Sequence, residues 1–274
     1  MLSLEYQGFA TMLINCRLAI SSARRLSLLI LVAFAISSDT TSQSLDASTT
    51  GGFFVPATEF HKGRFWTSTA TISAGYTATI IGLNEIWYKQ YPRGGFRFNN
   101  DWNEWENVDK MGHMFTTYLY SRWIADLYYW TGVPREKADW IGAGAGMLFQ
   151  TTLELLDGFS QQWGFSWSDM AFNTIGAGTY IGQQKLWGEQ RIMFKFSSTP
   201  INHPATSILS EDGESVTTLN KRADDLFGTG FFEMLLKDYN AQTIWTSINI
   251  YSFLNDQSKF PKWLNMAFGF GAYN

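Results

Sequence analysis

The stretch "WIGAGAGMLFQTTLELLD", residues 140–157, decides the predicted fold. Glycine and alanine alternate in its first half, so this part of the segment has very little side-chain bulk. Helix backbones can approach closely across such a face. Residues 167–187 repeat the feature. We predict two helices that pack against each other through these glycine faces, which are formed by Gly142, Gly144 and Gly146 in the first and by Gly176, Gly178 and Gly182 in the second.

Helical patterns continue on both sides of this segment. Residues 65–84 carry no charge and are long enough to cross a bilayer, with a buried core helix or a pair of β-strands as alternatives. We predict further helices over residues 107–130, 134–157, 241–254 and 261–268. The predicted fold class is all-α: a helical bundle with small-residue (Gly/Ala) interfaces, followed by a loop-rich, mostly helical C-terminal extension.

The N-terminal region has the pattern of a secretion signal. Arginines precede an apolar run at residues 26–36, and a Ser/Thr-rich polar tract follows it. The pattern predicts a signal peptide, with an uncleaved anchor or a start at Met12 as alternatives. The predicted organisation is a signal peptide at 1–38, a linker at 39–59, a helical domain at 60–190, and a C-terminal extension at 191–274 that packs on this domain.

Composition narrows the classes of partner. The net charge is −4, which provides no basic field for nucleic acid, so we exclude nucleic acid as a partner. Aromatic residues make up 17% of the chain and charged residues 16%, a balance that favours association with membrane lipid. The only cysteine, Cys16, has no partner in the chain for an internal disulfide. No sequence feature indicates a particular protein partner.

Polar residues recur at helical spacing within the apolar segments. Asp109 and His113 are four residues apart, and Glu154 and Asp157 are three apart. Each couple should lie on one face of its helix, as should Asp169 and Asn173. Because a buried charge without a partner costs several kcal/mol, roughly, we expect the couples to converge. The predicted polar cluster consists of Asp109, Lys110, His113, Glu154, Asp157, Ser166, Asp169 and Asn173.

Part of this cluster has residue types that bind metal ions. Carboxylates combined with one imidazole suit Mg, Mn or Zn. The candidate ligands are His113, Glu154, Asp157 and Asp169, although no motif indicates a specific cofactor or a catalytic residue. His203 lies in a long polar loop, and we expect it to be a solvated surface histidine.

Three motifs follow one another along this region: "DKMGH" at 109–113, "LELLD" at 153–157 and "WGFSWSDMAFNTIG" at 163–176. Their order and spacing resemble the YfiM-like family of periplasmic lipoproteins, over residues 109–182. A more distant similarity is to VanZ-like membrane proteins, from which the chain departs because Asp157 stands in the place of a glutamine. The resemblance implies a helical fold and a location in the bacterial envelope, periplasmic and membrane-associated. The family has no settled biochemical function, and no cysteine follows the apolar run as a lipoprotein would require.

Three functional hypotheses remain open for an uncharacterised cell-envelope protein of this kind. In the first, the cluster binds a lipid or polyprenyl headgroup, with Lys110 and His113 as donors. In the second, the protein is a metal-assisted hydrolase or transferase that acts on an envelope lipid, with His113 as general base. In the third, the cluster is a structural network that only fixes the register of the helices. Whether the protein is an enzyme stays open at this point.

Overall fold

A computed structural model describes residues 52–272, except 103, 200, 210–212, 214 and 256. The predicted signal peptide and residues 39–51 of the predicted linker lie outside the described residues. The α-helices in the described part of the chain are α3 (Lys62–Ile86), α4 (Val108–Trp130), α5 (Arg135–Gly158), α6 (Trp167–Trp187), α7 (Leu219–Phe227) and α8 (Phe231–Lys237). The strands are β1 (Phe98–Asn99), β2 (Phe165–Ser166), β3 (Ile192–Ser198), β4 (Ser207–Leu209), β5 (Val216–Thr218), β6 (Gln242–Asn249) and β7 (Asn265–Phe270).

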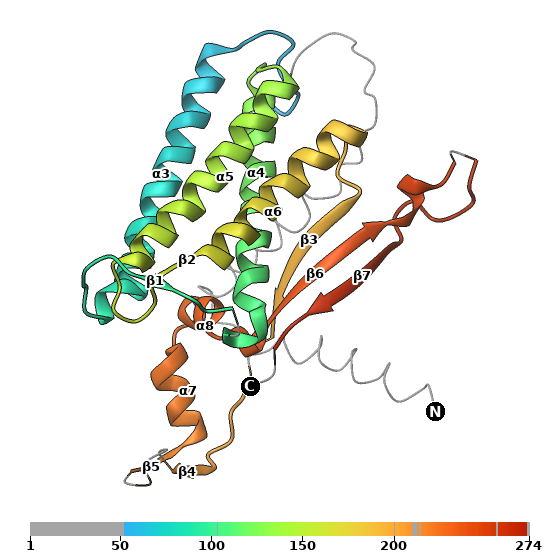
Figure 1. Ribbon diagram of the computed structural model, residues 1–274. Coiled ribbons are helices and arrows are strands. Elements are labelled where there is room, and N and C mark those ends of the chain that lie inside the picture. Colours follow the sequence, from blue (N-terminus) through green and yellow to red (C-terminus); the bar gives the residue numbers. More distant parts are fainter. Residues whose placement is uncertain are drawn as a thin grey trace. The chain divides into compact units, whose positions relative to one another are not determined.

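Helices α4, α5 and α6 lie side by side and form the centre of the structure (Figure 1). A side chain at Gly142 of α5 would collide with the Ser121 carbonyl oxygen of α4, and one at Gly176 of α6 would collide with the Met114 carbonyl oxygen of α4. Both glycine faces therefore pack on α4, and the prediction that they pack on each other is wrong. The other predicted interface glycines, Gly144, Gly178 and Gly182, face open space. At 3.6 residues per turn, alternate glycines cannot all share one helix face.

Helix α3 covers the charge-free segment. It begins at the N-cap residue His61, whose Nδ1 accepts a hydrogen bond from the Arg64 backbone N–H at 3.1 Å. The segment is one helix and not a pair of strands. Among the described helices, none has both the length and the apolar character that a membrane span needs.

The C-terminal part of the chain corrects the predicted fold class. Residues predicted as helix at 241–254 and 261–268 instead contribute β6 and β7, which form an antiparallel sheet in the order β3-β6-β7. Two more strand pairs, β1-β2 and β4-β5, complete three small sheets. The described residues are 57% helical and 15% strand, so the fold is mixed α/β and not all-α.

The physical reason lies in the alternation of side chains along β6. Ile244, Thr246 and Ile248 project to one face, opposite Phe196, Phe194 and Ile192 of β3. That face packs on α4, where Phe194 meets Tyr118 with ring centroids 5.2 Å apart. The β-branched residues gain cross-strand contacts only when β3 lies alongside, so their strand preference outweighs local helix propensity.

Candidate functional site

An unusual turn leads the chain into α4. Trp105, Glu106 and Asn107 all have left-handed backbone angles, with φ of 50°, 52° and 63°. Such angles are uncommon for residues other than glycine, and three in succession need outside support. Trp105 receives it from the aromatic rings of Phe227 and Tyr239, at centroid distances of 6.1 and 5.4 Å.

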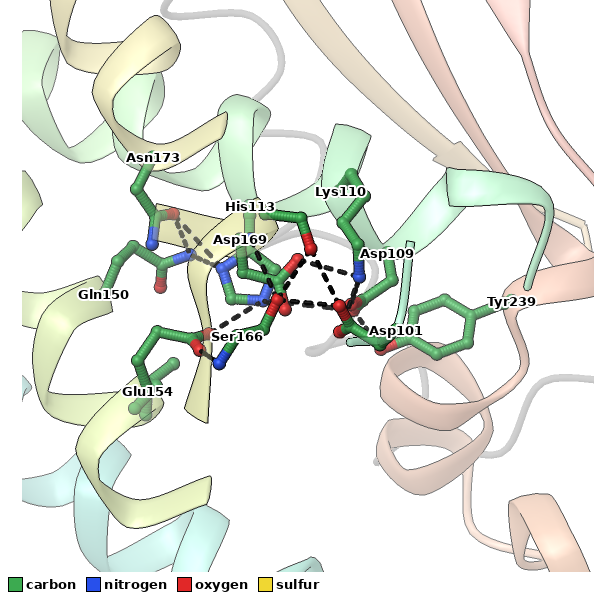
Figure 2. Close-up of polar contacts among 12 residues, drawn as sticks. Asp101, Asp109, Lys110, His113, Gln150, Glu154, Ser166, Asp169, Asn173 and Tyr239 are labelled. Carbon is green, nitrogen blue, oxygen red and sulfur yellow. Dashed lines mark hydrogen bonds and ion pairs between the residues drawn. The ribbon is translucent and has the colours of Figure 1, made fainter. Parts of the chain in front are cut away.

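The ends of three helices meet at the cluster. The first turns of α4, the last turns of α5 and the first turns of α6 each contribute residues (Figure 2). The Ser166 side chain caps α6 by accepting a hydrogen bond from the Asp169 backbone N–H at 3.1 Å, which fixes this helix start. From α4 come Asp109, Lys110 and His113; from α5 come Glu154 and Asp157; from the start of α6 come Ser166, Asp169 and Asn173.

Lys110 holds one side of the cluster together. Its side chain is fully buried, and its Nζ lies 2.6 Å from Asp101 Oδ2, 2.9 Å from Asp169 Oδ1 and 3.3 Å from Asp109 Oδ2. Burial alone would lower the pKa of Lys110, but these carboxylates outweigh it and hold the pKa above its ordinary value. The lysine is thus a charged, fully engaged structural partner.

His113 faces the other carboxylates with its Nε2 atom. Nε2 lies 3.5 Å from Glu154 Oε1 and 3.9 Å from both Asp109 Oδ1 and Asp169 Oδ2. Burial lowers the pKa of His113, yet the negative charges of Asp109, Asp169 and Glu154 raise it on balance to about 9. The imidazole therefore carries a proton at neutral pH when only carboxylates surround it.

The opposite ring nitrogen sets the orientation of His113. Nδ1 lies 3.1 Å from Asn173 Oδ1, which also accepts hydrogen bonds from the Thr117 hydroxyl at 3.0 Å and the Gln150 amide at 3.3 Å. Asn173 Oδ1 can only accept a hydrogen bond from Nδ1, whereas the Gln150 Nε2 amide, 3.1 Å from the same Nδ1, can only donate one. When Nδ1 carries the hydrogen and donates it to Asn173, the lone pair of the neutral imidazole belongs to Nε2, which points into the carboxylates.

Two further carboxyl groups of the cluster, those of Glu154 and Asp157, have raised pKa values. Burial raises the pKa of Glu154 to about 8 and that of Asp157 to about 7. Glu154 is 1% exposed, and its Oε1 makes no hydrogen bond among the described residues. Its Oε2 accepts one from the Ser166 backbone N–H at 3.0 Å. The neighbouring Tyr88 hydroxyl opposes this rise in the pKa of Asp157.

Asp101, Gln150 and Tyr239 belong to the cluster but were not predicted. Asp101 accepts from the Ser166 hydroxyl at 2.7 Å, and Tyr239 donates to Asp109 Oδ1 at 2.7 Å. Gln150 had a usable signal, since it lies one helical turn before Glu154 on α5. Asp101 lies in an irregular segment and Tyr239 in a three-residue 3-10 helix, Tyr239–Ala241. Neither segment is long enough to show a periodicity, so spacing could not identify these residues.

Three of the predicted residues have the arrangement of a metal-binding set. Each of Asp109, His113 and Asp169 offers one donor atom, and the three atoms lie within 4.8 Å of one another. Ligand atoms about 2.1 Å from a tetrahedral ion lie roughly 3.4 Å apart, and oxygens of Asp109 and Asp169 each lie 3.9 Å from His113 Nε2. Glu154 Oε1, 3.5 Å from His113 Nε2, lies outside this set of mutually close donor atoms.

Comparison with known proteins covers the same region. Residues 94–182 match the model of a family described as "Predicted periplasmic lipoprotein (DUF2279)". No curated protein and no solved structure matches the chain. The match includes all eight predicted cluster residues and ends before Tyr239. It does not test the more specific resemblance to YfiM-like or VanZ-like proteins, which stays a prediction. Residues 94–182 are therefore similar to a family of predicted periplasmic lipoproteins whose function is unknown.

Proposed function

We propose that this region is a divalent-metal-binding domain of a cell-envelope protein, with Asp109, His113 and Asp169 as ligands. The observation that carries the proposal is the closeness of their three donor atoms, within 4.8 Å. One imidazole nitrogen with carboxylate oxygens is a ligand set for zinc or manganese. The envelope location rests on the family match and on the predicted signal peptide.

The balance of charge supports a bound cation. Five carboxyl groups, those of Asp101, Asp109, Glu154, Asp157 and Asp169, surround one lysine and one histidine. Burial is the main cause of the raised pKa of Glu154, but the raised pKa of His113 reflects this excess of carboxylates, because taking up a proton relieves the repulsion. A divalent ion at the same place would relieve it without requiring those protons.

The orientation of His113 supports the same reading. Ligand histidines usually donate their second ring N–H to a carbonyl or carboxylate oxygen, which fixes the ring and its tautomer. Asn173 Oδ1 takes this role here at 3.1 Å. The buried Thr117 hydroxyl holds Asn173 in turn, so the support extends over two side chains.

The other hypotheses receive less support from these contacts. A phosphate-bearing headgroup would meet an excess of carboxylates, and the ammonium group of Lys110 is enclosed by three of them. A purely structural network accounts well for Lys110. It does not account for Glu154 Oε1, a buried atom that lacks a hydrogen bond and faces His113.

Metal-assisted hydrolysis or transfer is a second candidate, and Glu154 favours it. A divalent ion held by three side chains would supply Lewis-acid activation of a substrate oxygen or of water. Glu154, with a pKa near 8 and an Oε1 that makes no hydrogen bond among the described residues, is suited to accept or return a proton near neutral pH. We infer this role from the position of Glu154 beside His113 and from its protonation.

The test is metal analysis of the protein purified from its own envelope without chelators. Wild-type protein should hold stoichiometric zinc or manganese by elemental mass spectrometry, and the variants His113→Gln and Asp169→Asn should lose it while keeping their circular dichroism. His61→Asn is the matched control, because His61 is exposed and Asn also caps helices. A metal-free wild type that shows no saturable binding of either ion in calorimetry would sink the proposal.

A separate experiment tests the hydrolytic activity. Glu154→Gln should keep the metal but lose metal-dependent hydrolysis of a chromogenic ester or phosphoester. If the metal-loaded wild type hydrolyses neither probe faster than free ion does, the hydrolytic candidate loses its support and metal binding stands alone.

A further inference from the structure

A pocket lies in the C-terminal extension, outside residues 94–182. It has a volume of about 220 Å³ and lies between the segment that precedes β4 and helices α7 and α8. At about 30 Å³ per water molecule, this space suits a small ligand and is too large for a single bare ion. Its polar and aromatic lining comes from Asn202, His203, Asn220, Asp224, Phe227 and Asp238.

Two buried polar atoms at this pocket lack hydrogen bonds. Asp238 is 1% exposed, and its Oδ1 has no hydrogen-bond partner among the described residues. The same holds for Nε2 of His203, whose side chain is half-buried and not solvated as its polar loop predicts. A buried carboxylate oxygen without a donor is costly, and such atoms are rare in native proteins. Both atoms line one pocket, which points to a ligand that supplies donors.

The charge of the lining defines the class of ligand. Asp224 and Asp238 bring two carboxyl groups, and within the described chain no lysine or arginine lines this pocket. A cation with N–H groups would complement them. The ring of Phe227 forms part of the wall, and aromatic faces attract ammonium groups.

A metal ion fits this pocket less well. In the described residues, the only set of three close His, Cys, Asp or Glu donors is the one at Asp109, His113 and Asp169. Apolar side chains, including Ala223 and Met234, also line the pocket, and they suit an organic group better than a hydrated ion.

We propose that the pocket between His203 and Asp238 binds a primary ammonium group, with Asp238 Oδ1 accepting its hydrogen bond and Phe227 packing against it. The site is separate from the metal-binding cluster and does not rest on that function. The ammonium group could belong to a free amine or to the headgroup of an aminophospholipid, and the two sources share this chemistry.

The experiment is calorimetric titration of the full chain with ethanolamine, with choline and sodium acetate as comparison ligands. Ethanolamine should bind saturably. Choline lacks an N–H group and should bind at least about tenfold more weakly, as expected if one charge-assisted hydrogen bond is lost. Acetate should not bind, because the site is acidic. Choline binding as tight as ethanolamine, or no saturable ethanolamine binding by folded wild type, would overturn the proposal.

Variants connect the binding to this pocket. Asp238→Asn removes the charge of the acceptor and should weaken ethanolamine binding by at least about tenfold. Ala223→Leu leaves Asp238 in place but fills the pocket, so it should abolish binding even if Asp238→Asn fails to fold. Asp225→Asn, at an exposed position of α7 that does not line the pocket, should stay within about twofold of wild type, since screened surface charges contribute little. Wild-type affinity in a folded Ala223→Leu variant would contradict the assignment.

Two further experiments identify the source of the amine and test whether this pocket is independent of the metal-binding cluster. Phosphatidylcholine vesicles with phosphatidylethanolamine should bind wild type, and not Ala223→Leu, if the lipid headgroup is the ligand. Binding of ethanolamine alone, with no vesicle binding, identifies a free amine. His113→Gln should retain ethanolamine binding, so that failure of the metal proposal and failure of this one give different results.

Discussion

The Tyr239 hydroxyl donates a hydrogen bond to Asp109 Oδ1 at 2.7 Å, across 130 residues of sequence. This contact joins the C-terminal extension to the cluster in the family-matched region. Burial and the negative charge of Asp109 raise the pKa of Tyr239 well above its ordinary value, so the phenol stays a donor. Asp109 Oδ1 is also the oxygen nearest His113 Nε2 on this side, so Tyr239 orients a proposed metal ligand.

Replacing this tyrosine should be more costly than losing an ordinary hydroxyl. Tyr239→Phe removes a hydrogen bond to a charged group and should lower the free energy of unfolding by about 1.5–3 kcal/mol. Tyr76→Phe is the control: it loses a neutral bond to Thr152 and should cost about 0.5–1.5 kcal/mol. Urea unfolding measures both. Equal losses in the two variants would show that the charge of Asp109 adds nothing to this contact.

The glycines of α5 should respond in opposite directions. Gly142→Ala places a Cβ against the Ser121 carbonyl oxygen and Ala125, and should destabilise the protein by about 1–3 kcal/mol. Gly144→Ala meets no atom within 4 Å and should stabilise it by about 0.5–1 kcal/mol, because alanine is the better helix former. Thermal melts of both variants test the packing of α5 on α4, which a destabilised Gly144→Ala variant would call into question.

Substitutions of Lys110 and of Glu154 should affect stability differently, because Lys110 has a structural role and Glu154 faces the proposed ligand site. Lys110→Met leaves three carboxylates without their common cation and should cost about 3–5 kcal/mol in unfolding free energy. Glu154→Gln removes a charge that is already unfavourable at its position, since its pKa is raised to about 8. We expect its metal-free form to be as stable as wild type or more stable. A large loss in both variants would instead favour a single structural network.

The lowered pKa of Asp101 predicts that the protein loses stability in acid. Burial raises its pKa, but hydrogen bonds from Lys110, Ser166 and Ser168 outweigh burial and lower the pKa from 3.8 to about 2. A carboxyl group with a depressed pKa adds stability above its unfolded pKa of 3.8, and this stability disappears as the pH falls through about 2. Wild type should therefore lose unfolding free energy between about pH 4 and pH 2, and Asp101→Asn should lose less over this window. Parallel curves in urea titrations would exclude Asp101 as the cause.

Local physics accounts for what the sequence predicted correctly. The helices over residues 107–130, 134–157 and 167–187 follow from apolar periodicity and from a cap such as Ser166, which act within a few residues. The polar couples followed from the same spacing. His113 and Asp109 share a helix face because four residues make about one turn, and a low-charge body leaves such groups only one another as partners.

Only the tertiary structure decided the rest, because the deciding contacts join residues far apart in the chain. Ile244, Thr246 and Ile248 belong to a strand because β3 lies beside them, and no local property of that segment supplies β3. Gly142 faces α4 and Gly144 faces open space, a difference that depends on which helix packs there. Asp101 reaches the cluster from an irregular segment and Tyr239 from a single 3-10 turn, and neither is long enough for a period to mark a side chain's direction. The sequence by itself therefore determined the helices and the polar pairs within them, whereas long-range packing determined the sheet, the glycine contacts and the full set of cluster residues.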